Sequence, residues 1–216
     1  MTLQEILTQV QIKLEASADE IDFQDDETIA KIGLANEAIK IWSKAKGTEW
    51  NELFATESLG RMRAGDNEFD LPTGINKVIG VMIGEWGELP IAHPRQALKT
   101  KSFAGYIEGN PQSGQILKIN HKLAGDDQRV NQEIMLWYIK QPTLLEEADD
   151  EPEMSDPGFI VDYVCAELVL EDNPSLYSKF SAEYIRKLND MIEANNTALD
   201  YSETSVLDDS DMVIGG

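Results

Sequence analysis

The sequence predicts an α+β protein: a helical bundle with an inserted small antiparallel β-subdomain and a flexible acidic C-terminal tail. Apolar residues recur at helical spacing near both ends of the chain, whereas in the middle third they form short strand-like runs. Turn residues separate these middle runs. With 216 residues, 42% of them hydrophobic, the chain is long enough to bury a substantial core.

The N-terminal segment is expected to be a short amphipathic helix over residues 2–14. Its apolar face holds Leu3, Ile6, Leu7, Val10 and Leu14. Residues 15–27 then hold seven acidic residues and no basic one, which is typical of a solvated linker. Residues 1–25 are therefore expected to form an N-terminal helix and an acidic linker.

A second helix is expected from Asp26 to Gly47, with apolar residues on two sides. One stripe contains Ile29, Ile32, Ala35, Ile39 and Trp42, and the other contains Leu34, Ala38, Ile41 and Ala45. Two buried faces imply two neighbours, and one of them can be another subunit. The residues proposed to pack between subunits are Ile29, Ile32, Leu34, Ala38, Ile41 and Trp42. A short aromatic turn with Trp50, Leu53 and Phe54 is expected to follow.

The middle of the chain, residues 57–151, is expected to be the inserted β-subdomain and a second acidic linker. Its strand-like runs are Phe69–Leu71, Val78–Ile83, Tyr106–Ile107, Gln115–Ile119 and Glu133–Ile139. Glycines stand one by one at the turns between them, without the spacing of a phosphate-binding loop. The pattern therefore predicts a β-structure without a nucleotide site.

The last third returns to helical spacing. Asp156-Pro157 and Asn173-Pro174 each combine an N-cap residue with proline at the first helical position. The apolar stripes contain Ile160, Val161, Val164, Leu168 and Val169 in one helix, and Tyr177, Phe180, Tyr184, Leu188, Met191 and Ile192 in the other. Residues 26–56 and 152–197 are thus assigned to the bundle. The polar residues 198–216 are assigned to the tail.

The net charge of −22 comes from 40 acidic against 18 basic residues. Residues 15–27, residues 146–156 and the last 19 residues hold nineteen of the acids, so the acidity is expected to belong to linkers and the tail. Gripping DNA requires clustered lysine and arginine. The densest basic stretch is small and ends at Lys101, and it is interpreted as a solvated loop or a contact for an acidic partner.

Chemical sites are not predicted. The one cysteine, Cys165, lies in an apolar helical stretch and is expected to be a core residue. Neither His93 nor His121 has a nucleophile or an acid at catalytic spacing. We therefore nominate no catalytic, cofactor-binding or metal-binding residue, and the protein is not expected to be an enzyme. No apolar run is long enough to span a bilayer and no signal peptide is found, so a soluble protein made in the cytoplasm is expected.

The order of short motifs in this chain is distinctive. It begins with residues 27–42 (ETIAKIGLANEAIKIW), Trp50–Phe54 and Asp70-Leu71-Pro72, and continues with residues 136–145 (LWYIKQPTLL), an acidic linker, Asp156-Pro157 and Tyr184–Asn189. This order resembles that of the head-to-tail adaptor (connector, or neck) proteins of tailed bacteriophages, including the tail tubular protein A type. The resemblance covers about residues 25–195 and leaves residues 1–25 outside it.

The resemblance implies a structural protein of the virion neck that is made in the host cytoplasm. Such adaptors form a homo-oligomeric ring, typically dodecameric, beneath the portal protein. They extend the channel through which DNA passes without specific binding during genome ejection, and they offer a platform for the next tail or neck protein. A membrane plays no part in this arrangement.

The C-terminal tail is expected, by the same resemblance, to clasp the portal. Its proposed portal-binding residues are Tyr201, Val206, Leu207, Met212, Val213 and Ile214. Isolated apolar residues among polar ones are typical of a segment that orders on its partner. A disordered terminus without a role is the alternative interpretation.

Other functions remain open at this level. One is a neck or tail-completion protein with a similar fold and a different partner. Another is an acidic DNA mimic that inhibits a host enzyme, although most of the excess acid is expected in linkers. An enzyme acting on polysaccharide is the last, and no carboxylate pair can be named for it.

Overall fold

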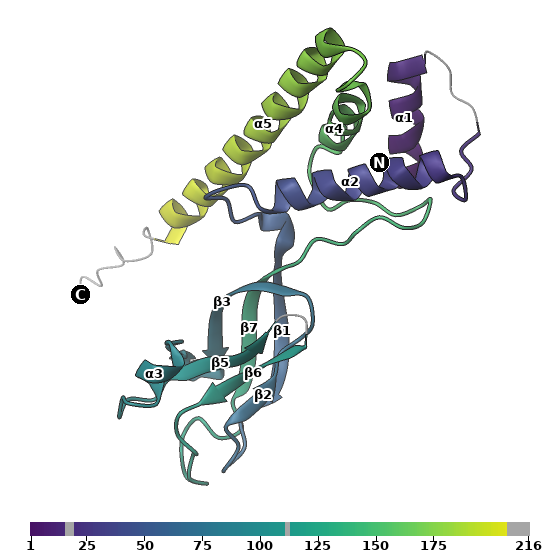
Figure 1. Cartoon of the computed structure of the whole chain (residues 1–216). Coiled ribbons are helices and arrows are strands. Elements are labelled where there is room, and N and C mark those ends of the chain that lie inside the picture. The colour runs from purple at the N-terminus through teal and green to yellow at the C-terminus, as the bar shows by residue number, and fades with distance from the viewer. Residues whose placement is uncertain (16–19, 111–112, 207–216) are drawn as a thin grey trace. The chain divides into compact units, whose positions relative to one another are not determined.

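The computed structural model describes residues 1–15, 20–110 and 113–206, with side chains described as far as Thr197. The described chain is an α+β protein with five α-helices and two antiparallel β-sheets (Figure 1). It divides into two compact units. The helical unit comprises Met1–Glu52 and Pro142–Gly216, and the β unit comprises Leu53–Gln141.

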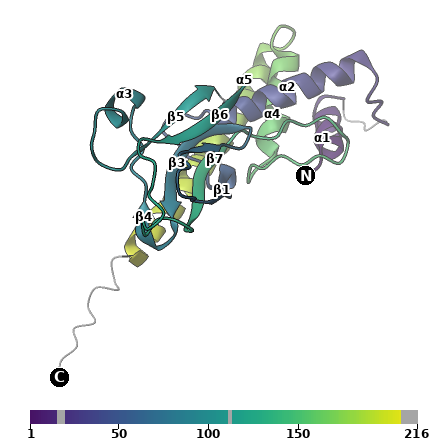
Figure 2. The same cartoon turned by 90° about the horizontal axis from the view of Figure 1, so that it is seen from below.

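Four helices build the helical unit: α1 (Leu3–Glu15), α2 (Asp26–Ser43), α4 (Gly158–Val169) and α5 (Pro174–Val206). Helix α4 packs against each of the other three, and Figures 1 and 2 both show it between α1 and α5. Nine of its twelve residues are buried, an unbroken run that ends at Ala166. A helix that is apolar almost all round forms the centre of a core.

The predicted start of α5 at Pro174 is confirmed, whereas α4 begins at Gly158, one residue later than predicted, with Pro157 at its N-cap. The Asp156 carboxylate accepts a hydrogen bond from the Gly158 N–H at 2.9 Å, and the Asn173 side-chain oxygen accepts one from the Leu176 N–H at 3.1 Å. Each side chain therefore satisfies one of the backbone donors that a helix leaves unpaired at its first turn.

Helix α5 is longer than the sequence indicated. The helical pattern was expected to end near Asn195-Asn196, but the helix continues to Val206, inside the segment assigned to the tail. Residues 197–206 contain neither glycine nor proline, so nothing in them stops a helix. The Asn195 side chain lies inside the helical unit, where its Oδ1 accepts from the Asn51 N–H and its Nδ2 donates to the Glu49 carbonyl.

The acidic segment before α4 is a connector without helix or strand, and it is fixed to the helical unit. The Asn36 side chain of α2 donates to the Leu145 carbonyl at 2.9 Å and accepts from the Leu145 N–H at 2.8 Å. Leu145 and Met154 are both buried. The apolar residues between the carboxylates therefore anchor residues 142–157 to the helical unit.

Helix α1, whose role the resemblance left open, is part of the same core. Its buried face contains Leu3, Ile6, Leu7 and Val10. The N–H groups of Leu3 and Gln4 donate to the carbonyls of Asp150 and Ala148 at 2.8 and 3.0 Å. The acidic segment thus satisfies backbone donors at the start of α1.

The β unit contains two sheets. The four-stranded sheet has the order β1 (Phe54–Arg61), β7 (Glu133–Lys140), β3 (Ile75–Ile83) and β4 (Gly87–Glu88). The three-stranded sheet has the order β2 (Glu68–Asp70), β6 (Gly114–Ile119) and β5 (Gly105–Asn110), and helix α3 (Pro94–Ala97) precedes β5 in the chain. Four of the five predicted runs lie wholly in strands, and the fifth, Phe69–Leu71, overlaps β2 but extends one residue beyond its end at Asp70. Strand β1 was not predicted, and Phe54, expected in a turn, begins it.

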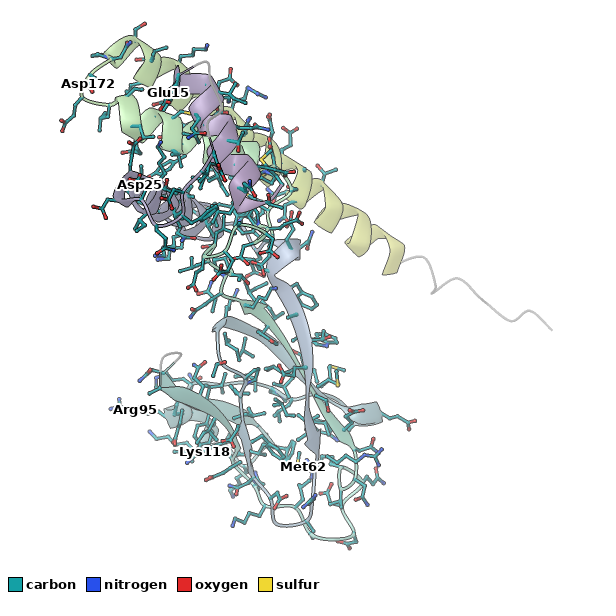
Figure 3. The ribbon with its side chains drawn as sticks, turned by 90° about the vertical axis from the view of Figure 1, so that its right-hand side faces the viewer. Glu15, Asp25, Met62, Arg95, Lys118 and Asp172 are labelled. Carbon is teal, nitrogen blue, oxygen red and sulfur yellow. The ribbon has the colours of Figure 1, made fainter. Side chains whose placement is uncertain are left out.

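The core of the β unit lies between its two sheets. It contains Met62, Phe69, Leu71, Ile75, Val81, Ile83, Leu89, Leu117, Ile119, Leu123, Ile134, Leu136 and Tyr138. Met62, labelled in Figure 3, is fully buried. Because both sheets contribute to one core, the β unit is a small two-sheet sandwich.

Candidate interaction surfaces

Both histidines and the cysteine make local structural contacts. The His93 ring accepts from the Arg95 N–H at the start of α3, and His121 Nδ1 lies 2.7 Å from Asn120 Oδ1. Cys165 is a core residue, as predicted, and desolvation raises its thiol pKa to about 12. In the part of the chain that the structure describes, no group of three His, Cys, Asp or Glu residues could hold a metal ion. No helix there is long and apolar enough to cross a membrane.

The proposed subunit-packing residues of α2 do not share one surface. Ala38 and Trp42 are fully buried inside the helical unit, where the Trp42 and Trp50 rings lie 5.0 Å apart. Ile32 and Leu34 are half-buried. Ile29 is 53% and Ile41 38% exposed, and they lie about 120° apart around the helix. The second apolar face is thus buried at Ala38 within the unit's own core, and neither Ala38 nor Trp42 is exposed to contact another subunit. Packing of Ile29, Ile32, Leu34 and Ile41 between subunits stays a prediction.

The proposed portal-binding residues lie largely outside the residues that the structure describes. Tyr201 and Val206 belong to α5, but their side chains are outside the described residues. Leu207, Met212, Val213 and Ile214 lie outside them altogether. Their assignment to portal binding stays a prediction.

The net charge is divided unequally between the two units. The β unit contains ten acidic and ten basic residues and is neutral. The helical unit contains thirty acidic and eight basic residues, so it carries the whole charge of −22. Nineteen of these thirty acidic residues belong to residues 15–27, 146–156 and 198–216, the segments to which the sequence pattern assigned the excess. The structure adds that several acids of the first two segments lie on α2 or accept hydrogen bonds from the backbone of the helical unit. Charge of this density repels phosphates over several ångströms.

One acidic surface of the helical unit lies where α1 ends and α2 begins. Its carboxylates surround a pocket of about 210 Å³ and belong to Glu15, Glu20, Asp22, Asp25 and Glu27. Figure 3 labels Glu15 and Asp25. Lys31 is almost fully buried and donates to the Glu27 carboxylate at 2.7 Å, so one of these charges is paired.

A buried ion cluster joins three helices, and it was missed by the sequence analysis. Asp162 of α4 is 2% exposed and binds Lys13 of α1 through Oδ1 and Lys187 of α5 through Oδ2, the latter at 2.8 Å. Gly158 lies directly beneath the Lys187 ammonium, and a Cβ there would clash with it. The sequence signal that could have revealed this cluster is a single charged residue within the apolar run of α4, because a buried carboxylate requires a partner.

We call the pocket around this cluster the lysine groove. Its volume is about 330 Å³, and it is lined by Lys13, Asp162, Leu176, Lys179, Phe180, Glu183 and Lys187. The Lys179 ammonium lies 5.8 Å from the centre of the buried Phe180 ring. Glu183 is paired with Arg186 at 3.0 Å. The groove therefore combines an apolar wall with excess positive charge in an otherwise acidic unit.

The β unit presents an aromatic platform next to a polar pocket of about 470 Å³. The Arg129 guanidinium carbon lies 3.8 Å from the Phe103 ring centre and 5.3 Å from that of Trp86. Hydrogen bonds from Arg129 hold the Asp127 pKa at about 2. Trp86 is 42% exposed, and an exposed aromatic ring held rigidly by its neighbours is a common anchor at protein interfaces.

A second exposed tryptophan lies on the outer face of the four-stranded sheet. Trp137 is 38% exposed and pairs across the strands with Gly80. A Cβ on Gly80 would lie in ordinary van der Waals contact with the Trp137 ring, at 3.8 Å, and closer to Glu88 Oε1, at 3.3 Å. Phe54, 45% exposed, is on the adjacent strand β1. This face is an apolar surface that the sequence analysis did not nominate.

The comparison with known proteins assigns no family to the chain. No protein-family model matches it, and no curated protein is significantly similar to it in sequence. The functional argument therefore depends on the surfaces described above.

Proposed function

We propose that the protein is a head-to-tail adaptor of a tailed bacteriophage: a structural, non-enzymatic virion protein. Copies form a homo-oligomeric ring beneath the portal protein, extend the DNA channel and provide the attachment platform for the tail. In this proposal the helical unit is the bundle of the ring wall, and the β unit is its inserted subdomain. The observation that carries the proposal is the division of charge between an acidic helical unit and a neutral β unit.

The acidic helical unit suits a channel through which DNA slides. A wall that bound phosphates would release counterions and hold the duplex. Ordered carboxylates such as those around Glu15 and Asp25 repel phosphates instead. DNA then passes without specific binding.

The neutral β unit suits contact with protein. It carries no net charge that would repel an acidic neighbour, and two tryptophans, Trp86 and Trp137, are exposed on it. Exposed aromatic residues are enriched in interface centres. We assign the attachment of the next tail or neck component to this unit.

The experiment is an affinity purification of the tagged full-length protein from a lysate of phage-infected cells, followed by mass spectrometry and electron microscopy. The expected result is a larger ring that co-purifies, with this protein stacked coaxially beneath it. Association with tail components and not with a portal ring would favour a tail-completion or neck protein. A compact complex with one host enzyme and no ring would contradict both.

The acidic DNA mimic is the second candidate, and one structural observation favours it that the sequence did not show. Mimicry requires carboxylates at fixed positions, and the structure shows many of them on ordered helices and an anchored segment. Its test is inhibition of a DNA-binding enzyme that salt relieves. Inhibition without salt dependence would count against mimicry.

A further inference from the structure

We infer that the lysine groove of one copy binds the acidic segment Leu207–Ile214 of a second copy of this chain. The contact would join copies in one direction, from the C-terminal end of α5 to the groove beside the next copy's α1. This inference assigns Leu207, Met212, Val213 and Ile214 to a contact between subunits in place of the portal contact predicted from the sequence. It deepens the proposed function and rests on that function only for closure of the ring.

The groove contains N–H donors that can bind a ligand. Lys13 and Lys187 share the single buried carboxylate of Asp162, although each ammonium carries three N–H donors. Their side chains are 36% and 18% exposed, so donors can face an incoming ligand. Lys179 adds a third, exposed ammonium above Phe180. The groove thus favours a ligand with several carboxylates.

The groove also has an apolar wall. Leu176 is 37% exposed beside the buried Phe180 ring, on the same face of α5 as Lys179. A simple inorganic anion would leave this wall uncovered. A peptide with both carboxylates and apolar side chains uses the whole groove.

The segment Leu207–Ile214 has this composition. Its sequence, LDDSDMVI, contains three aspartates and four apolar residues, and no lysine or arginine follows Lys187 anywhere in the chain. The aspartates complement the three ammonium groups. Leucine, methionine, valine and isoleucine complement the wall.

The geometry of α5 decides which copy supplies the segment. Lys187 precedes Val206 by nineteen residues of one helix, which is about 28 Å along its axis. Asp208 to Asp211 follow Val206 by two to five residues, and fully extended chain spans at most about 18 Å over five residues. A copy therefore cannot place its own aspartates in its own groove. The contact is heterologous, and such contacts close into rings when the rotation permits.

The first test uses a fluorescent peptide of residues 207–216, titrated into the full-length protein at low salt and followed by anisotropy. We expect saturable binding that Lys179→Glu weakens by at least about tenfold, because reversal replaces an attraction with a repulsion. Lys40→Glu, an exposed reversal on α2, is the matched control and should change little. A scrambled peptide should bind more weakly. Equal effects of both reversals, or equal binding of both peptides, would overturn the inference.

The second test is a charge exchange in the full-length chain, with self-association measured by sedimentation velocity and by ring assembly with the co-purified portal. Lys179→Glu alone and Asp209→Lys alone should each weaken association between copies, and the double variant should restore it. Rings that form unchanged with Lys179→Glu would refute the groove's role and leave the adaptor function standing. Specific peptide binding without any ring or portal would refute the adaptor function and leave the groove contact standing.

Discussion

Replacement of Asp162 tests whether the buried ion cluster stabilises the helical unit. Asp162→Asn keeps the size of the side chain but removes the charge that Lys13 and Lys187 share. Breaking a fully buried pair costs about 3–5 kcal/mol. Both lysines retain some contact with water, at 36% and 18% exposure, so we expect a loss of about 2–3 kcal/mol in the free energy of unfolding after that discount.

Urea unfolding followed by circular dichroism at 222 nm measures this change, because most of the helix belongs to the helical unit. A loss of 2–3 kcal/mol shifts the midpoint by about 1 M urea. Arg186→Ala is the matched control on α5: its pairs with Glu183 and Asp190 are exposed, so we expect little change in the urea midpoint. Equal shifts for the two variants would refute the reasoning, since the cluster would then contribute no more than a surface pair.

Three further predictions concern single residues. Arg129 lowers the Asp127 pKa from 3.8 to about 2, so the contribution of this pair to stability should be full above pH 4 and lost as the pH falls through 2. NMR titration of the Asp127 carboxyl carbon should show this lowered pKa, and Arg129→Ala should raise the pKa. Cys165 should react with a thiol reagent at least about a hundredfold more slowly in native than in urea-unfolded protein, because reaction requires opening of the core. Gly109→Ala should lower the stability of the β unit by about 2 kcal/mol, because its φ is +94° and a Cβ would meet a carbonyl of β6; Gly125→Ala, in open space, should change it by less than about 0.5 kcal/mol.

Elements with a strong local signal could be predicted from the sequence. Strands β3 and β7 are apolar enough to be recognised, and the Asp-Pro and Asn-Pro pairs mark the starts of α4 and α5 within a residue. Strand β1 has no such signal: most of its residues are exposed, and it lies at the edge of its sheet. Its place depends on pairing with β7, almost eighty residues later in the chain, which periodicity does not report.

The candidate surfaces were harder to predict, because each depends on residues distant in sequence. Asp162 and Lys13 are separated by 149 positions, and their pairing arises from helix packing. Charge runs were interpreted as linkers because carboxylates are normally solvated. Leu145 and Met154 nevertheless anchor the run between them, and two apolar residues in an acidic segment carry too little local signal to show this.

The order of the units along the chain has a consequence for synthesis. Helices α1 and α2 leave the ribosome before α4, the helix on which both pack, which begins at Gly158, more than a hundred residues after α2 ends at Ser43. At about 5–20 residues per second, this delay lasts about 6 to 23 seconds. The β unit can complete its core during that time, while the apolar face of α1 is still without its main partner. The apolar face of α1 therefore stays exposed until α4 emerges, and transiently exposed apolar surface favours aggregation.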